Sequence, residues 1–265
     1  MLDIRNVKRL VVKVGSSTLT HANGKLNLRL IEKLARVLSD LRNNGREVVF
    51  VSSGSISAGV ARLGLKERPS DLERIQAAAA VGQSEIMHIY SRAFGEYGHT
   101  VAQFLLTRDV VDNAETRRNV INAFEACMSL GAIPIVNEND TVSTTEIMHY
   151  MTFGDNDRLS AIVASIINAQ LLINLSDYNG FYDADPREDP EARLIPVVRE
   201  ITDEIRAAAG GAGTSRGRGG ASAKIAAADI CRAAGIPMII TAGENPEIIY
   251  EIFDGHSVGT IFLPE

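Results

Sequence analysis

Short runs of apolar residues recur along the chain, and segments with helical periodicity separate most of them. The runs at residues 10–14 and 48–51 are wholly apolar apart from Lys13. Strands that are apolar on both faces are typical of parallel sheets covered by helices. The alternation therefore predicts an α/β protein, a three-layer α/β/α sandwich around a largely parallel sheet. We expect strands at 10–14, 48–51, 101–106, 133–136, 171–175, 236–240 and 258–263, and helices at 28–41, 56–63, 72–97, 113–130, 201–209, 222–234 and 246–253.

The charge balance argues against partners that are held by a broad basic surface. The chain has 27 Lys and Arg against 33 Asp and Glu, a formal net charge of −6, so neither nucleic acid nor an anionic membrane is an expected partner. The N-terminus lacks an apolar signal segment, and the apolar stretch at 162–175 is interrupted by polar residues. We therefore expect a cytoplasmic protein without a membrane span, in which Cys127 and Cys231 are reduced core thiols.

Lys13 stands inside the first apolar run, where a charged side chain is unusual. Lysine is almost never buried unless another group pairs with it. The simpler alternative is a lysine at a strand end whose ammonium group reaches water. Gly15, Ser16 and Ser17 follow directly, and the backbone N–H groups of such small residues can approach an anion closely. The stretch is therefore a candidate anion site.

Polar segments also follow the strands expected at 48–51 and 133–136. Residues 52–55 (SSGS) lie at a helix start, where free N–H groups and the helix dipole favour an anion. Residues 137–140 (NEND) are either ligands for a cation or amine, or a turn stabilised by its own side chains. Because parallel strands bring their carboxyl ends to one edge of the sheet, we expect these segments to face the same site as Lys13.

A second lysine follows a glycine-rich segment. Residues 210–220 contain six glycines and form a flexible linker unless a ligand or neighbour orders them. Lys224 is expected just inside the next helix, where a cation opposes the helix dipole unless an anion lies there. Asn156 and Asp157 precede another apolar helix and have a simpler role as caps, but Asp157 can also pair with both Lys13 and Lys224.

Two lysines and an aspartate at the edge of a sheet suit phosphoryl transfer. That reaction needs cations and donors that neutralise charge on the transferred group, and it needs little covalent chemistry from the protein. Other motifs are missing from the sequence: there is no GxxxxGK[ST] phosphate loop, and no GxGxxG follows the first strand, which counts against a dinucleotide dehydrogenase. No His or Cys spacing suggests zinc.

Taken together, these segments resemble the amino acid kinase family, and the resemblance covers essentially the whole chain. Within the family they are similar to the members that phosphorylate the γ-carboxylate of free glutamate, the first step of proline biosynthesis. The resemblance rests on residues 12–17 (VKVGSS), 52–59 (SSGSISAG), 80–83 (AVGQ), 137–140 (NEND), 154–157 (GDND) and the loop before Lys224. It implies one amino acid kinase domain over residues 1–265, without the C-terminal RNA-modification-type domain that many members carry.

The resemblance also implies roles for individual residues. Lys13 and Lys224 would stabilise the phosphoryl group in transit, and Asp157 would orient them. The substrate L-glutamate would be held by Ser53, Asp140 and Asn156. The ATP site would be formed by Lys13, Ser176, Asp177, Arg218, Gly219, Gly220, Ala221, Ser222, Ala223 and Lys224. Mg²⁺ would bridge the ATP phosphates, with no residue assigned as a metal ligand. A homo-oligomer and inhibition by proline are also implied.

The residues themselves favour glutamate over some related substrates. Carboxylates such as Glu138 and Asp140 would pair with a free α-ammonium group, whereas an acetylated amine carries no charge and the phosphate of UMP would be repelled. The same carboxylates argue less firmly against aspartate as the substrate. Two rival functions remain open: a kinase of another small acid such as aspartate, and a nucleotide-binding regulatory protein that keeps the fold without catalysis.

The sequence departs from the family pattern in two places. The glycine loop of the family usually has the pattern Gly-Thr-Gly-Gly-Met-x-Thr-Lys, and here residues 217–224 are GRGGASAK. The lost threonine hydroxyl weakens phosphate contact, while Arg218 adds a charged donor. The connection from Glu146 to Phe153 is a few residues longer than expected. Nucleotide affinity and the shape of the substrate lid are where we expect this chain to differ from its relatives.

Overall fold

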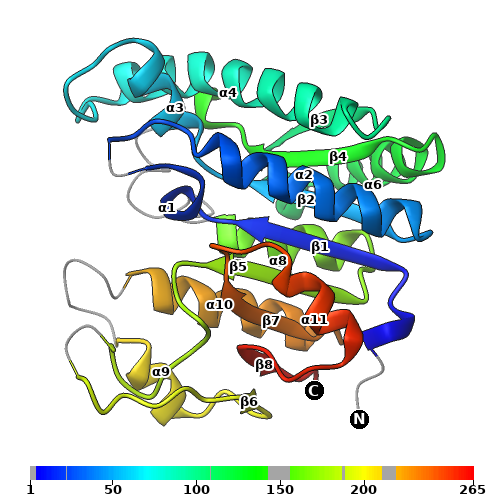
Figure 1. The fold of residues 1–265 in the computed structure, drawn as a ribbon, viewed down its shortest axis with the longest axis vertical. Helices are drawn as coiled ribbons and strands as arrows, with labels where there is room; N and C mark the ends of the chain where they lie inside the picture. Colours follow the sequence, from blue (N-terminus) through cyan, green and yellow to red (C-terminus); the bar gives the residue numbers. More distant parts are fainter. Residues whose placement is uncertain (1–3, 22, 108, 143–155, 187–188, 211–218) are drawn as a thin grey trace.

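The computed structural model describes residues 4–21, 23–107, 109–142, 156–186, 189–210 and 219–265. Within these residues eight strands form one sheet in the order β3-β4-β2-β1-β5-β7-β8-β6 (Figure 1). Their bounds are β1 Arg9–Val14, β2 Glu47–Ser52, β3 Val101–Leu106, β4 Ile133–Glu138, β5 Leu171–Ser176, β6 Val197–Val198, β7 Met238–Ala242 and β8 Thr260–Phe262. Neighbouring strands are parallel except β7 and β8, which are antiparallel.

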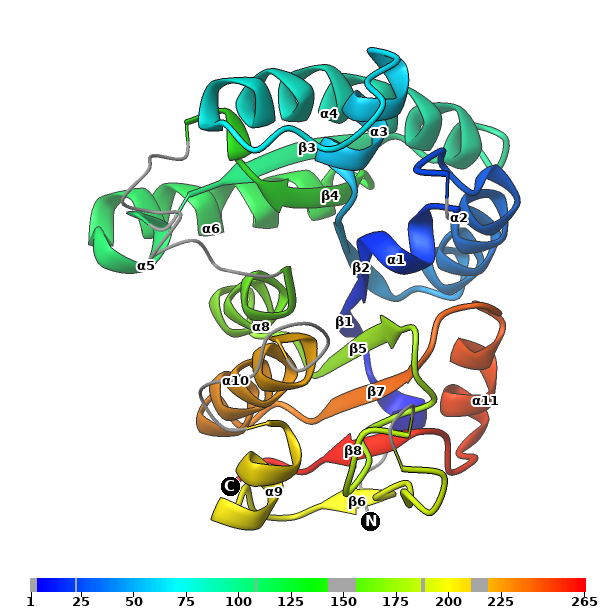
Figure 2. The ribbon, with the colours of Figure 1, turned by 90° about the vertical axis from the view of Figure 1, so that its left-hand side faces the viewer.

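Helices cover both faces of this sheet, which confirms the predicted three-layer arrangement (Figure 2). Helices α2, α3, α4 and α11 enclose one hydrophobic cluster, and α5, α6, α8 and α10 enclose the other. The helices are α1 Ser16–Leu19, α2 Leu28–Asn43, α3 Ser55–Arg62, α4 Leu72–Gly95, α5 Asp109–Asp112, α6 Ala114–Ser129, α8 Asn156–Ile166, α9 Asp203–Ala208, α10 Gly219–Ala233 and α11 Ile248–Asp254, with short 3₁₀ turns at Ile4–Asn6 and Asp140–Val142.

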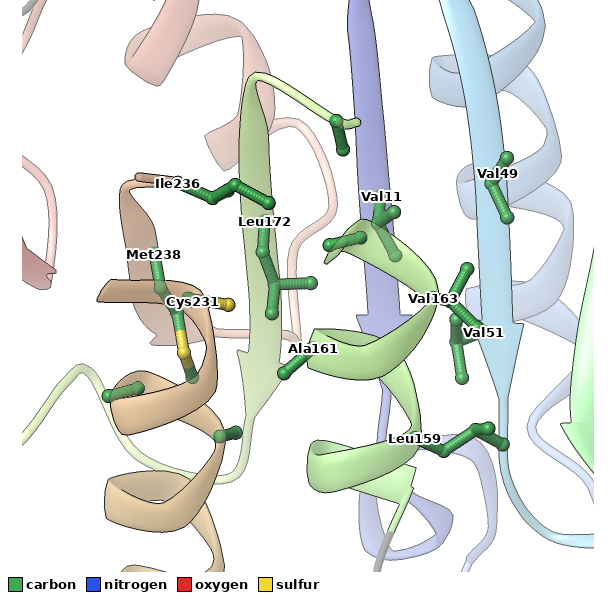
Figure 3. Packing of buried hydrophobic residues seen from close by; sticks show 14 of the residues in the cluster. Val11, Val49, Val51, Leu159, Ala161, Val163, Leu172, Cys231, Ile236 and Met238 are labelled. Carbon is green, nitrogen blue, oxygen red and sulfur yellow. The ribbon is translucent and has the colours of Figure 1, made fainter. Parts of the chain in front are cut away.

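The apolar runs form buried strands because helices pack against both faces of the sheet. In Figure 3 the side chains of Leu159 and Val163 in α8 lie against Val51 of β2, with Val11 of β1 close by. Full burial of a Val or Leu side chain contributes about 1.5–3 kcal/mol, so this cluster fixes α8 on the sheet. The position of α8 matters because its first residues, Asn156 and Asp157, belong to the candidate site.

Several predicted boundaries of helices and strands were wrong near glycines. The expected strand at 236–240 begins only at Met238, because Gly235 has a left-handed φ of 72° and Ile236 still closes the helix end on Cys231. The expected helix at 222–234 begins earlier, at Gly219. The short elements α1, α5 and β6 were not predicted, since four residues or fewer carry too little periodicity. Cys231 is a buried thiol as expected, whereas Cys127 is only partly buried.

The connectivity places a ligand crevice beside β1. The chain runs from β1 to β2 on one side and reaches β5 on the other side of β1 later in the sequence. In open parallel sheets ligands bind outside the carboxyl ends of the strands at such a switch point. Lys13 is the penultimate residue of β1, and residues 53, 137–140 and 176–177 lie at the carboxyl ends of the neighbouring strands. The fold therefore brings the predicted site residues to one edge.

Candidate active site

Lys13 is buried in the sheet and paired with Asp157. Its side chain is 4% exposed and that of Asp157 is 0% exposed, and the Lys13 ammonium forms an ion pair with Asp157 Oδ1. The alternative in which the lysine reaches water is therefore wrong for this chain. Removing the charge of Asp157 from this pair would leave the Lys13 ammonium uncompensated in the interior, which costs about 3–5 kcal/mol. Lys13 can be buried because its partner Asp157, in the first turn of α8, lies next to it.

Asp157 also contacts the second predicted lysine. Lys224 Nζ lies 3.4 Å from Asp157 Oδ2 and 3.4 Å from the carbonyl oxygen of Gly220 in the first turn of α10. Burial by itself raises the pKa of Asp157, but the charges of Lys13 and Lys224, together with hydrogen bonds, outweigh it and hold that pKa below its usual value. One carboxylate between two ammonium groups leaves an excess positive charge, which suits a phosphoryl group.

Asn156 belongs to a network of amide side chains on the other side of Asp157. Its Nδ2 lies 2.7 Å from Ser53 Oγ, 2.8 Å from Asn137 Oδ1 and 3.0 Å from the carbonyl oxygen of Ser52. Asn137 Nδ2 in turn donates to Gln83 Oε1 at 2.9 Å. Because Gln83 is in α4 and Asn137 is in β4, the network ties the start of α8 to two elements far apart in the sequence.

Asp140 lies beside this network and is held by Ser55. Ser55 Oγ donates to Asp140 Oδ2 at 2.8 Å. Burial raises the pKa of Asp140 above its usual value, although the Ser55 hydrogen bond and the charge of Arg68 oppose the shift. A partly desolvated carboxylate of this kind gains more from an incoming ammonium group than an exposed one does.

Two glycines allow the close helix packing that positions Ser55. A Cβ at Gly82 in α4 would lie 1.8 Å from the carbonyl oxygen of Ser55, and one at Gly59 in α3 would lie 1.8 Å from the carbonyl oxygen of Ala78. Any side chain at either position would force α3 and α4 apart. The AVGQ segment therefore has two structural functions: Gly82 permits the contact, and Gln83 joins the amide network.

A cavity of about 520 Å³ opens beside Lys224. It is lined by residues that follow β5, among them Asp177, by Ala207–Gly210, and by Gly220, Ala221 and Lys224 of α10. Ser176 Oγ donates to Asp177 Oδ1 at 3.0 Å. Small side chains and a lysine beside a turn are suited to a nucleotide whose phosphates point at Lys224.

The predicted site residues are thus largely brought together. Lys13 and Lys224 both contact Asp157, Ser53 and Asn156 are hydrogen-bonded, and Asp140 accepts from Ser55, two residues after Ser53. Gly219, Ser222 and Ala223 lie in the first two turns of α10, and Ser222 and Ala223 are not among the described residues that line the cavity. Arg218, the rest of the glycine loop at 211–217 and the long connection at 146–153 lie outside the described residues. The roles of all these residues stay predictions.

Sequence reasoning missed three residues of the site. Asn137 stands inside the NEND segment but was not chosen, and Gln83 gave no chemical signal of its own. Asn174 of β5 donates to Asp157 Oδ1 at 2.7 Å. An asparagine in the apolar run 171–175 was a signal of the same kind as Lys13, and could have been followed in the same way.

Among the residues that the structure describes, no three His, Cys, Asp or Glu side chains gather closely enough to hold a metal ion. The described helices also include none that is long and apolar enough to cross a membrane.

The fold and the paired lysines at its switch point define a class of small-molecule kinases, and comparison with known proteins agrees. Residues 8–242 match the amino acid kinase family. The chain therefore belongs to the amino acid kinase family, as its motifs indicated. Solved structures with a similar fold include isopentenyl phosphate kinase from T. acidophilum, with 16% identity, a TM-score of 0.66 and coverage of 96% of this chain and 100% of the other. UMP kinase from Bacillus anthracis has 14% identity, a TM-score of 0.63 and coverage of 98% and 97%.

Relatives with higher identity include several glutamate 5-kinases. Glutamate 5-kinase from Clostridium perfringens is 53% identical over 260 residues, which cover 98% of this chain and 97% of the relative. Glutamate 5-kinase from Listeria welshimeri is 55% identical, with coverage of 98% and 94%, and that from Enterococcus faecalis is 46% identical, with coverage of 98% and 96%.

Proposed function

We propose that this protein is a glutamate 5-kinase, which transfers the γ-phosphoryl group of ATP to the γ-carboxylate of L-glutamate. The product is γ-glutamyl phosphate, and the reaction is the first step of proline biosynthesis. The observation that carries the proposal is the buried cluster of Lys13, Asp157 and Lys224 between an amide-lined side and a cavity. Relatives named glutamate 5-kinase, at 46–55% identity, support the choice of substrate.

In this proposal the lysines act on the group in transit. Lys13 and Lys224 approach it from opposite sides of Asp157 and neutralise the charge that its oxygens carry in the transition state. Asp157 accepts from both and fixes their ammonium groups in place. Because the three side chains are almost fully enclosed, their charges act through a medium of low dielectric, where each interaction is stronger than in water.

Glutamate would bind on the amide side. Asp140 would pair with its α-ammonium group, while Ser53 and Asn156 would donate to or accept from its polar groups. The γ-carboxylate would then point at Lys13. An N-acetylated amine offers no charge to Asp140, so the same carboxylate selects against acetylated substrates.

ATP would occupy the cavity beside Lys224, bordered by Asp177, Gly220 and Ala221. Ser176 would support Asp177 through its hydrogen bond. Mg²⁺ prefers oxygen ligands and is usually held in kinases by substrate phosphates with few protein carboxylates. The cavity that would hold those phosphates is lined by Lys224 and by carboxylates such as Asp177. When bound, Mg²⁺ would neutralise phosphate charge.

The test is ATP-dependent acyl phosphate formation trapped with hydroxylamine, with glutamate, N-acetylglutamate and aspartate compared side by side. We expect the highest kcat/KM with glutamate. A preference for aspartate would mean that aspartate, and not glutamate, is the substrate. ATP binding without hydroxamate formation from any of the acids would favour a regulatory protein without catalysis.

The proposal extends to regulation and assembly. Proline is expected to inhibit the enzyme, and the chain is expected to form a homo-oligomer. Initial rates with millimolar proline check the former, and unchanged rates would remove it. Sedimentation or light scattering of the purified protein checks the latter.

A further inference from the structure

Asn174 is a polar residue inside the apolar run 171–175 of β5. It is the fourth residue of β5, a strand buried along its whole length, and its own exposure is 0%. Leu171, Leu172, Ile173 and Leu175 surround it in the same strand. An uncompensated buried amide costs about 1–3 kcal/mol in proteins, so an apolar residue would be expected here unless the amide has a task.

The register of the sheet places that amide at the reacting cluster. Asn174 lies opposite Lys13 in the parallel pair β1 and β5, so the two side chains leave the sheet on the same face. The first turn of α8 lies over that face, and Asn174 Nδ2 donates to Asp157 Oδ1 at 2.7 Å. That oxygen also accepts from Lys13, while Oδ2 faces Lys224.

We infer that Asn174 is a positioning residue for phosphoryl transfer: its amide fixes the rotation of the Asp157 carboxylate, so that one oxygen serves Lys13 and the other serves Lys224. The inference rests on the proposed kinase function. A neutral donor is suited to this task, because it holds the carboxylate without changing the excess positive charge of the cluster. A third charged side chain would either cancel that excess or add to the repulsion between the lysines.

The second polar atom of Asn174 supports this inference. Its buried Oδ1 has no hydrogen-bond partner among the described residues. The reversed amide would place Oδ1 against Asp157 Oδ1, two acceptors in contact, so the orientation that donates to Asp157 is the favourable one. Within the described residues this buried carbonyl oxygen is therefore unsatisfied, and the contact to Asp157 is the interaction that accounts for an amide at this position.

The central experiment replaces Asn174 by an apolar residue of similar volume. Asn174→Leu removes the donor and the unsatisfied oxygen together, so we expect kcat with glutamate to fall about tenfold, as for one lost hydrogen bond to a charged group, while the melting temperature is unchanged or higher. A merely structural role predicts the opposite pattern, with lower stability and unchanged kcat. Wild-type kcat in a folded Asn174→Leu enzyme would overturn the inference.

The pH profile gives a readout that packing does not move. Charged groups face Asp157 from β1, as Lys13, and from α10, as Lys224, while β5 supplies only the neutral amide. Without that amide the pKa of Asp157 rises toward its usual value, so the acid limb of the kcat profile moves to higher pH in Asn174→Leu. An acid limb at the wild-type position would contradict the inference.

Asn174→Asp is the second variant and decides the matter if the leucine variant does not fold. A carboxylate of the same shape would cancel the excess positive charge, so we expect a loss larger than tenfold at neutral pH, with partial recovery on acidification as the two carboxyl groups share a proton. Wild-type activity and pH dependence in this variant would overturn the inference.

Ser39→Ala is the matched control. Ser39 in α2 is buried, and its Oγ likewise has no hydrogen-bond partner within the described residues, but it lies in the helix layer on the other face of the sheet from α8. Its removal should alter stability alone.

Failure of the proposed kinase function can be distinguished from failure of this inference. If the protein is not a glutamate kinase, the wild type makes no hydroxamate from glutamate. Acid unfolding of Asn174→Leu would still begin at a higher pH than that of the wild type, because the contact between Asn174 and Asp157 is independent of the substrate.

Discussion

The two sides of the crevice use different chemistry. Toward β2 and β4 the site consists mainly of neutral amides and hydroxyls that bond to one another, from Gln83 through Asn137 to Asn156, with Asp140 as the one carboxylate that the proposal uses there. Toward β5 and α10 it consists of charged groups and a cavity lined by small residues. The boundary runs between Asn156 and Asp157, which are consecutive residues at the start of α8. Asn156 belongs to the side of the amides, and Asp157 belongs to the side of the charged groups.

This difference matches two different demands. A small amino acid must be distinguished from close analogues, which requires a rigid set of directed donors and acceptors. The transferring phosphoryl group carries charge that changes during the reaction, and fixed ammonium groups lower its energy whatever molecule is attached. Substitutions on the two sides should therefore have separable kinetic effects.

The largest effect is expected from the charged side. Lys13→Ala and Lys224→Ala should each lower kcat by on the order of 10²-fold or more, because each removes a cation that acts in the transition state. Steady-state kinetics with the hydroxamate assay measures the loss. Lys8→Ala, at an exposed position before β1, is the control and should leave kcat unchanged. Wild-type turnover in either buried-lysine variant would remove the role given to that lysine.

Asp140→Ala tests the amide side. Loss of a charged partner for the α-ammonium group should raise KM for glutamate about tenfold or more, with a much smaller change in KM for ATP. Varying each substrate at saturating levels of the other separates the two constants. Equal changes in both would mean that Asp140 does not touch the amino acid.

Gly82→Ala tests whether helix packing maintains that side. The added Cβ would meet the carbonyl oxygen of Ser55 at 1.8 Å, and overpacking of this kind costs about 1–3 kcal/mol. We expect a lower melting temperature and a higher KM for glutamate, because Ser55 moves away from Asp140. Gly95→Ala is the control in the same helix, since its Cβ would have no neighbour within 4 Å. Similar melting temperatures for the two variants would refute the packing argument.

The smallest effect is expected from pH. Burial raises the pKa of Asp140, so this carboxyl group becomes protonated at a higher pH than an ordinary aspartate, and its neutral form cannot pair with an ammonium group. KM for glutamate should therefore rise a few-fold as the pH falls toward the raised pKa. Measurement of KM from pH 7.5 to 5 checks this. If Asp140→Asn shows the same rise, another group is responsible.

Much of the site could be predicted because its residues violate local expectations. Lys13 in an apolar run, six glycines before Lys224 and a surplus of caps at Asn156 and Asp157 were each visible in the sequence. Gln83, Asn137 and Asn174 were missed since their contacts are with residues 54, 19 and 17 positions away. A hydrogen bond between distant segments leaves no periodicity that a sequence window can detect.

The sequence by itself determined the layered α/β class, the order of most helices and strands, and the family, because apolar periodicity and the motif residues are local properties. The tertiary structure decided which groups meet. Only the register of β5 against β1 sets Asn174 beside Lys13, and only the packing of α8 on the sheet brings Asp157 to both lysines. Those contacts depend on strand pairing and side-chain packing across the whole chain, and burial then turns ordinary charges into a strongly interacting cluster.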